Sequence, residues 1–231
     1  MTWKEDAKRR AAVEAVKHVK DGYFVGLGSG STVKYALEEL GRVMRDKGLN
    51  VLGVPTSYDT MLLAIENRIP LTTLHEHPEL DIAIDGADQI DPNLNLIKGG
   101  GAALTKEKIV DRAAEQLIII ADETKLTETL GKNCHVPIEV LPFATPRVMR
   151  KIQELKGKAT LRKARGKVGP IITDNGNFIV DADFGSIEDP KKLEAKLKLT
   201  PGIIETGLFI EMADIAYVGA KTGLKILKRA K

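Results

Sequence analysis

Residues 23–44 read YFVGLGSGSTVKYALEELGRVM, and this stretch indicates the fold. Its first five residues are apolar or glycine and suit a short buried strand, and the turn Gly28-Ser29-Gly30-Ser31-Thr32 follows. The buried face of the next helix is marked, at helical spacing, by Val33, Leu37, Leu40 and Met44. We therefore expect a strand, a glycine-rich turn and a helix in succession.

The same alternation extends outward on both sides of this stretch. Thr2 and Glu5 form a capping box that opens a first helix, whose apolar face carries Ala12, Val16 and Val19. Further strands are predicted at 51–54, 81–84 and 117–121, and helices at 58–67 and 105–115. Apolar strands that alternate with helices predict an α/β fold, a Rossmann-like open parallel sheet with helices on both faces.

The pattern changes after Leu130. A strand is predicted at 138–141 and a helix at 146–155. A hairpin follows, with arms at 169–173 and 178–182, because Asn175-Gly176 favours a tight primed turn. Local antiparallel pairing predicts an inserted, smaller α+β domain.

The end of the chain is expected to return to the first sheet. Strands are predicted at 208–212 and 215–218, followed by a short C-terminal helix. The expected division is an α/β catalytic domain over 1–128 and 206–231, with the inserted domain over 129–205.

The composition limits the function. The 231 residues hold 35 Lys and Arg against 32 Asp and Glu, a net charge of +3, with 43% hydrophobic and 4% aromatic residues. Such a balance supplies neither a phosphate-neutralising stripe nor stacking platforms, so no nucleic-acid partner is expected. No apolar stretch is long enough for a membrane span and no secretory signal is visible, which predicts a cytoplasmic protein. The single cysteine, Cys134, predicts no internal disulfide.

The glycine-rich turn permits three interpretations. Ser31 stands where a dinucleotide fingerprint requires its third glycine, and the Gly-Lys of a P-loop is absent, so both nucleotide motifs are disfavoured. A phosphate site remains, because glycines let the backbone approach a ligand, and free N–H groups and hydroxyls at a helix N-terminus suit an anion. The alternative is a tight turn in which Ser31 or Thr32 only caps the helix.

A second segment concentrates charged residues. Asp85 and Asp88 follow a predicted strand, at the end where open α/β sheets bind ligands. Lys98-Gly99-Gly100-Gly101 and Glu107 come next, so two carboxylates, an ammonium and a third carboxylate could converge. Capping and turn formation would also explain the aspartates, and a helix-dipole position would explain Glu107. A triple glycine costs backbone entropy, however, which favours a functional role for the whole segment.

Two lysines complete the candidate set, and two other patterns are set aside. Lys8 continues the apolar face of the first helix, either as a phosphate ligand or as a snorkelling side chain, and Lys125 follows a strand end.

His75 and His77 have no second ligand cluster, so we predict no metal site. The basic segment 156–167 lacks aromatic residues and is interpreted as a solvated face.

Together these motifs resemble the type A family of ribose-5-phosphate isomerases, in the same order and over nearly the whole chain. The resemblance rests on 26–32, 85–88, 98–107 and Thr173-Asp174-Asn175-Gly176-Asn177-Phe178. It implies interconversion of D-ribose 5-phosphate and D-ribulose 5-phosphate in the pentose phosphate pathway, without metal or organic cofactor. It also implies a homodimer or homotetramer, with the inserted domain serving oligomerisation.

The resemblance also implies roles for individual residues. Glu107 would be the base that moves a proton between C2 and C1 through an enediol; Asp85 would assist ring opening, and Lys98 would stabilise the oxyanion. Asp88 would hold sugar hydroxyls or orient Lys98. The implied substrate-binding residues are Lys8, Ser29, Gly30, Ser31, Thr32, Thr56, Gly99, Gly100 and Lys125. Ser29 stands where threonine is expected in many relatives, a change that keeps the hydroxyl.

The residue chemistry agrees with this activity, since aldose–ketose isomerisation needs a base beside a carbon-bound proton and a cation or donor beside the carbonyl oxygen. Two rival classes share the predicted sheet. A non-catalytic sugar-phosphate sensor would not need Glu107 beside a triple glycine, and no DNA-binding module is seen. A coenzyme A transferase would need a glutamate nucleophile motif, which is not evident.

Overall fold

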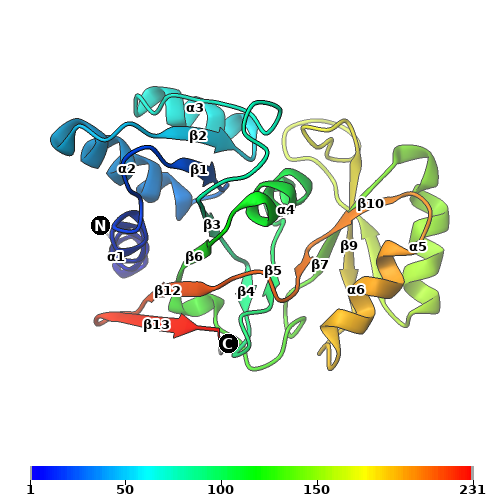
Figure 1. Ribbon diagram of the computed structural model, residues 1–231. Coiled ribbons are helices and arrows are strands. Elements are labelled where there is room, and N and C mark those ends of the chain that lie inside the picture. Colours follow the sequence, from blue (N-terminus) through cyan, green and yellow to red (C-terminus); the bar gives the residue numbers. More distant parts are fainter. Residues whose placement is uncertain (1, 230–231) are drawn as a thin grey trace. The chain divides into compact units, whose positions relative to one another are not determined.

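The computed structural model describes residues 2–229, which divide into two compact units (Figure 1). Unit 1 holds the described residues of Met1–Ala87, Lys106–Lys125 and Glu211–Lys231, and unit 2 holds Asp88–Thr105 and Leu126–Ile210. Segment 88–105 thus groups with unit 2, although the expected boundaries place it in the α/β domain. Its two short strands, at 89–90 and 96–97, pair with each other, and the second also pairs with a strand at 208–209, which accounts for this grouping.

Unit 1 is built on a six-stranded sheet with the order β13-β12-β6-β3-β1-β2, in which β13 alone runs antiparallel. Its strands are β1 (Phe24–Leu27), β2 (Leu52–Pro55), β3 (Ile82–Gly86), β6 (Leu117–Asp122), β12 (Ile215–Gly219) and β13 (Leu224–Lys228). Its helices are α1 (Trp3–Val16), α2 (Val33–Lys47), α3 (Tyr58–Glu66) and the short η1 (Glu123–Lys125), and α4 (Leu104–Ala113) begins in unit 2 and ends in unit 1.

Helices cover both faces of this sheet, which confirms the predicted fold class. Val25 and Leu27 of β1 belong to one core with α1 and α2, which lie beside each other in Figure 1. Gly26, between them, points to the opposite face, where a Cβ atom would lie 2.7 Å from Val110 of α4 and 2.8 Å from Ala83. Only glycine lets α4 approach the sheet so closely.

The two ends of unit 1 give one confirmed and one wrong prediction. The capping box of Thr2 and Glu5 is present at the start of α1. The predicted C-terminal helix is wrong, because residues 224–228 form β13, paired with β12 from Ile215 to Gly219. A short helix would satisfy only its own hydrogen bonds and is marginal in isolation, whereas the edge of β12 offers a complete set of backbone partners.

Unit 2 contains a four-stranded antiparallel sheet, β10-β7-β9-β8, and a three-stranded sheet, β11-β5-β4. The strands of the first are β7 (Val136–Val140), β8 (Lys158–Leu161), β9 (Phe178–Asp183) and β10 (Ile203–Thr206); those of the second are β4 (Gln89–Ile90), β5 (Leu96–Ile97) and β11 (Leu208–Phe209). Its helices are η2 (Pro142–Ala144), α5 (Thr145–Glu154) and α6 (Pro190–Lys198). Val148 and Leu197 bring α5 and α6 into one core with Ile138 of β7.

The predicted hairpin is only partly formed. β9 takes the position of the second arm, but it pairs with β7 and β8, and residues 169–173 make only isolated bridges such as Ile172 to Phe178. Both edges of β9 are therefore occupied by strands distant in sequence. Gly176 has a φ of 80° while Asn175 does not have a positive φ, which suits a longer hairpin loop rather than the predicted two-residue primed turn.

Within the described residues, no helix combines the length and the apolar character that a membrane crossing requires.

Candidate active site

The carboxyl edge of the unit 1 sheet carries several of the candidate residues of that unit. β1 lies between β2 and β3, and all three run parallel, so their carboxyl ends reach the same edge. The chain leaves β1 for β2 on one side and later returns to β3 on the other, which makes this the switch point where open α/β sheets bind ligands. Ser29 follows β1 and Thr56 follows β2, while Asp85 is the last residue but one of β3 and Lys125 lies shortly after β6.

Asp85 is completely buried, and the glycine-rich turn is built around it. Its Oδ1 accepts hydrogen bonds from the backbone N–H groups of Ser29, at 3.0 Å, and Gly86, at 2.6 Å. A Cβ atom on Gly28 would lie 2.1 Å from that oxygen, so the close approach of the turn to the carboxylate requires glycine. The Asp85 carboxylate and the glycine-rich turn therefore hold each other in place, and neither can move without the other.

Ser29 also connects the turn to a group of hydroxyls. Its Oγ lies 2.7 Å from Thr56 Oγ1 and Ser57 Oγ and 3.0 Å from Thr60 Oγ1. Thr60 in turn donates to the Gly28 carbonyl at 2.7 Å, and Thr56 is completely buried. Ser57 and Thr60 are additions to the predicted set. Their signal in the sequence is the run Thr56-Ser57 ahead of a predicted helix, which alone indicates no more than a cap.

The turn ends in a cluster suited to an anion. Lys8 Nζ of α1 donates to Ser31 Oγ at 2.8 Å, so the lysine reaches the turn rather than only covering apolar surface. Thr32 precedes α2 without a side-chain capping bond, and Gly30 has a φ of 111°. Simple capping by Thr32 therefore does not explain the turn. An ammonium, hydroxyls and the N-terminus of a fifteen-residue helix meet here.

Glu107 and Lys125 lie on two other elements of unit 1. Glu107 is in the first turn of α4 and is only 5% exposed. Lys125 ends η1, directly after β6, and is half-buried. A buried carboxylate on a helix and a lysine at a strand end are the placements that the sequence predicts for them.

Unit 2 contributes Lys98 and Asp88 on either side of a short hairpin. Lys98 is 2% exposed, and its Nζ lies 5.2 Å above the ring of Phe209, a cation–π contact that stabilises an ammonium out of water. Asp88 accepts a hydrogen bond from the Gly100 N–H at 2.8 Å. A Cβ on Gly100 would lie 2.9 Å from the Asp88 carboxylate, so this glycine is needed for the contact.

Arg162 is a part of this region that the sequence analysis missed. It pairs with Asp181 through two hydrogen bonds and donates to the carbonyls of Gly99 and Gly100, both at 3.0 Å. Its side chain is 17% exposed, so Arg162 is an exception to the solvated face predicted for 156–167. No local pattern separates Arg162 from its basic neighbours, and only the tertiary contact reveals its role in holding the triple-glycine loop.

Of the two neighbouring histidines His75 and His77, one has a packing role. His77 stacks on Phe24, with ring centroids 3.8 Å apart, while His75 and Glu76 are exposed. Over residues 2–229, no three His, Cys, Asp or Glu side chains come together in a way that would hold a metal ion.

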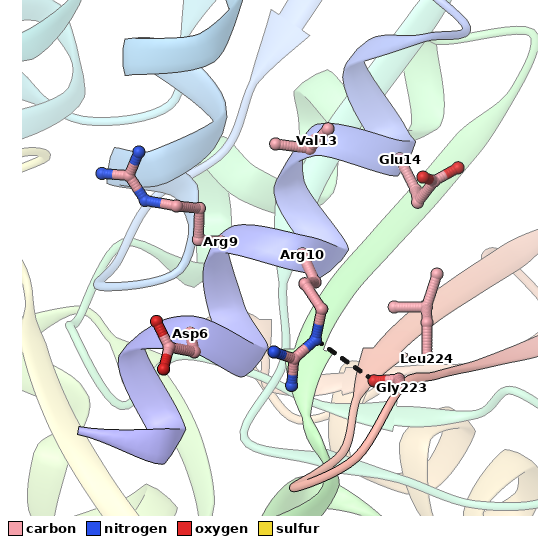
Figure 2. Close-up of a pocket in the computed structure, with 7 residues that line it drawn as sticks. All are labelled: Asp6, Arg9, Arg10, Val13, Glu14, Gly223 and Leu224. Carbon is pink, nitrogen blue, oxygen red and sulfur yellow. Dashed lines mark hydrogen bonds between the residues drawn. The ribbon is translucent and has the colours of Figure 1, made fainter. Parts of the chain in front are cut away.

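A separate groove of about 370 Å³ opens on unit 1 between α1 and the turn before β13 (Figure 2). Arg10 lies across it and donates to the Gly223 carbonyl at 3.3 Å. None of the candidate residues lines this groove, whose lining is Asp6, Arg9, Arg10, Val13, Glu14, Gly223 and Leu224.

Each unit by itself holds groups that suit proton transfer on a small polar substrate. Unit 1 offers a buried carboxylate on α4, a second on β3 and an anion cluster at the turn. Unit 2 offers a buried ammonium and a carboxylate beside a glycine loop. Carboxylates serve as general bases, and a desolvated ammonium stabilises developing negative charge far better than it would in water.

Comparisons with known proteins agree with this chemistry. The family model described as ribose 5-phosphate isomerase A (phosphoriboisomerase A) matches residues 52–223. The ribose-5-phosphate isomerase A of Methanosarcina acetivorans is 53% identical over 225 residues, covering 97% of this chain and 95% of the relative. That of Methanothermobacter thermautotrophicus is 51% identical over 221 residues, covering 96% and 97%.

Solved structures give the same result. Ribose 5-phosphate isomerase A from Methanocaldococcus jannaschii superimposes with a TM-score of 0.94 at 45% identity, covering 97% of this chain and 99% of the other. A D-ribose-5-phosphate isomerase in complex with phospho-erythronic acid superimposes with a TM-score of 0.96 at 46% identity, covering 99% and 100%.

Proposed function

The chain belongs to the ribose 5-phosphate isomerase A family, and from this membership we propose that it converts D-ribose 5-phosphate to D-ribulose 5-phosphate with Glu107 as the base. Proteins of this family interconvert these two sugars, so the protein is an aldose–ketose isomerase. The observation that carries the base assignment is the burial of the Glu107 carboxylate, 5% exposed, in the first turn of α4. A desolvated carboxylate is a stronger base toward carbon than one in water.

The proposed reaction proceeds through an enediol. Asp85, held by the turn, assists opening of the sugar ring. Glu107 removes the proton from C2 of the aldose and returns it to C1, while a proton passes from the C2 hydroxyl to the C1 oxygen. Lys98 stabilises the negative charge on oxygen in between, and Asp88 holds sugar hydroxyls or orients Lys98. The hydrogen atoms are only redistributed within the substrate, so this sequence is redox-neutral and needs no redox cofactor.

The phosphate is proposed to bind at the glycine-rich turn. Lys8, Ser31 and Thr32 would contact it, since the 2.8 Å bond between Lys8 and Ser31 already joins a cation to a hydroxyl beside a helix N-terminus. Lys125 would add a second charge. Ser29, Gly30, Thr56, Gly99 and Gly100 are proposed to line the sugar, and the phospho-erythronic acid in the related structure is a phosphorylated sugar acid of similar size.

The base assignment is tested by Glu107→Gln, which keeps the shape but cannot accept the proton as a carboxylate does. We expect kcat to fall by at least about a hundredfold with ribose 5-phosphate as substrate, followed as ketose formation by chelator-treated protein. Wild-type turnover would remove Glu107 from this role. Binding of ribose 5-phosphate without any conversion by the unaltered protein would instead favour a sugar-phosphate sensor.

We also propose that unit 2 mediates self-association into a homodimer or homotetramer. Its surface exposes large apolar side chains, with Phe143 at 95% and Leu199 at 84%. Such side chains mark an interaction site where they join into one patch, and we propose that a second copy of the chain covers them. Light scattering after gel filtration tests this: a monomer would contradict it. We further propose that the protein acts in the pentose phosphate pathway of the cytoplasm. Isotope labelling of cells lacking the protein tests the pathway, and fractionation of cells tests the compartment.

A further inference from the structure

Glu139 is a buried carboxylate that the proposed reaction does not use. It lies on β7, is 0% exposed, and accepts hydrogen bonds from four side chains. Burying a carboxylate is costly unless its oxygens are well hydrogen-bonded, so a fold that retains one commonly uses it to hold other groups in place. The identity of its partners indicates what is held.

Three of the four donors come from one turn. Oε1 accepts from Thr173 Oγ1 at 2.9 Å, Asn175 Nδ2 at 3.0 Å and Asn177 Nδ2 at 2.9 Å. Thr173 Oγ1 also accepts from the backbone N–H groups of Asn175 and Asn177, so the turn is internally braced. This accounts for the motif 173–178, which has no part in the proposed chemistry. The turn fixes the position of the Glu139 carboxylate.

The fourth donor belongs to the helix of the proposed base. Thr105 Oγ1 donates to Glu139 Oε2 at 2.5 Å, and Thr105 is the second residue of α4. Glu107 follows two residues later in the same turn. Residues two apart on an α-helix point to nearly opposite sides, so Glu139 holds the helix on the side away from the Glu107 carboxylate.

The same face of β7 also supports the glycine loop. Pro137 and Glu139 share this face, opposite to the core that contains Ile138. A Cβ on Gly99 would lie 3.2 Å from Pro137, which puts the loop before α4 in contact with β7. The same face of β7 therefore supports two segments: Pro137 contacts the glycine loop, and Glu139 binds the first turn of α4.

We infer that Glu139 is a positioning residue, which orients the first turn of α4 through Thr105 and thereby sets the direction of the Glu107 carboxylate. This inference rests on the proposed role of Glu107. A base displaced by about 1 Å from its reacting proton loses much of its rate without any loss of substrate affinity. Breaking the Thr105 bond should therefore lower kcat and leave KM unchanged.

The test is Thr105→Val, which keeps the side-chain shape and removes the hydroxyl. We expect kcat to fall about tenfold, with KM within about twofold of wild type. Thr105→Ser, which restores the hydroxyl, should restore most of kcat. The matched control is Thr145→Val, which removes the hydroxyl that donates to the Pro142 carbonyl at 2.9 Å in the first turn of α5, and should change thermal stability but not kcat.

A double variant separates positioning from other effects. If Thr105 acts through Glu107, Thr105→Val should cause little further loss in the Glu107→Gln background, because coupled residues are non-additive. Two results would overturn the positioning role of Glu139 and leave the base role of Glu107 intact. One is a kcat for Thr105→Val equal to that of Thr145→Val, and the other is a full tenfold further loss of kcat in the double variant. Wild-type turnover by Glu107→Gln would instead overturn the base assignment, and the inference with it.

Discussion

Replacing Gly28 by alanine tests whether the glycine turn and Asp85 form one structure. The added Cβ would lie 2.1 Å from Asp85 Oδ1, 2.2 Å from its Cγ and 2.6 Å from its Cα. Rotating the Asp85 side chain cannot relieve the last of these contacts, because the Cα belongs to β3. The turn or the strand must therefore move, and the carboxylate must lose its bond to Ser29.

The cost follows from two effects. Overpacking a rigid site costs about 1–3 kcal/mol, and a lost hydrogen bond to a charged group adds about 1.5–3 kcal/mol. Some of this is relieved by local movement, so we expect about 3 kcal/mol of lost stability. For a protein of this size that corresponds to a melting temperature roughly 6–12 °C lower.

The matched control is Gly86→Ala, one residue beyond Asp85. Its Cβ would come no closer than 3.7 Å to another heavy atom, an ordinary contact, and its φ is not positive. Calorimetry should therefore show a change within about 0.5 kcal/mol for this variant. If Gly28→Ala melts at the same temperature as Gly86→Ala and retains its kcat, the turn is not packed on Asp85 as described.

Two further predictions concern the anion cluster and the pH dependence of stability. Lys8→Ala should raise KM for ribose 5-phosphate at least tenfold and leave kcat within about threefold, because it removes a cation that contacts the phosphate and leaves the groups around the reacting carbons in place. Steady-state kinetics measure both constants, and an unchanged KM would show that the phosphate binds elsewhere. Burial chiefly lowers the pKa of His18, helped by the charge of Lys228, and its Nε2 lies 2.7 Å from the Tyr217 hydroxyl. Since the unfolded chain binds this proton more readily, His18 contributes stability that is present above about pH 6.5 and is lost as the pH falls through the lowered value. Urea unfolding at pH 7.5 and 5.5 should show a smaller loss on acidification for His18→Gln than for wild type, and equal losses would contradict the assignment.

Local patterns were sufficient for the framework of unit 1. The strand predicted at 23–27 is observed at 24–27, and the helix begins at Val33 as predicted, since buried strands and amphipathic helices leave short-range periodicities. The candidate residues at strand ends follow from the same logic, because parallel strands deliver their carboxyl ends to one edge.

Predictions that depended on distant partners were less accurate. Residues 224–228 form a strand because β12 leaves an open edge, and β8 displaces the expected hairpin arm.

The amino-acid order by itself determined the alternating α/β framework, the inserted antiparallel part and the set of residues able to carry the chemistry. Only the tertiary structure decided which groups hold them: Asp85 against Gly28, Arg162 on the carbonyls of Gly99 and Gly100, and Glu139 on Thr105. Periodicity records which face of an element is buried, whereas these contacts join residues dozens of positions apart, and nothing in either local segment specifies the other.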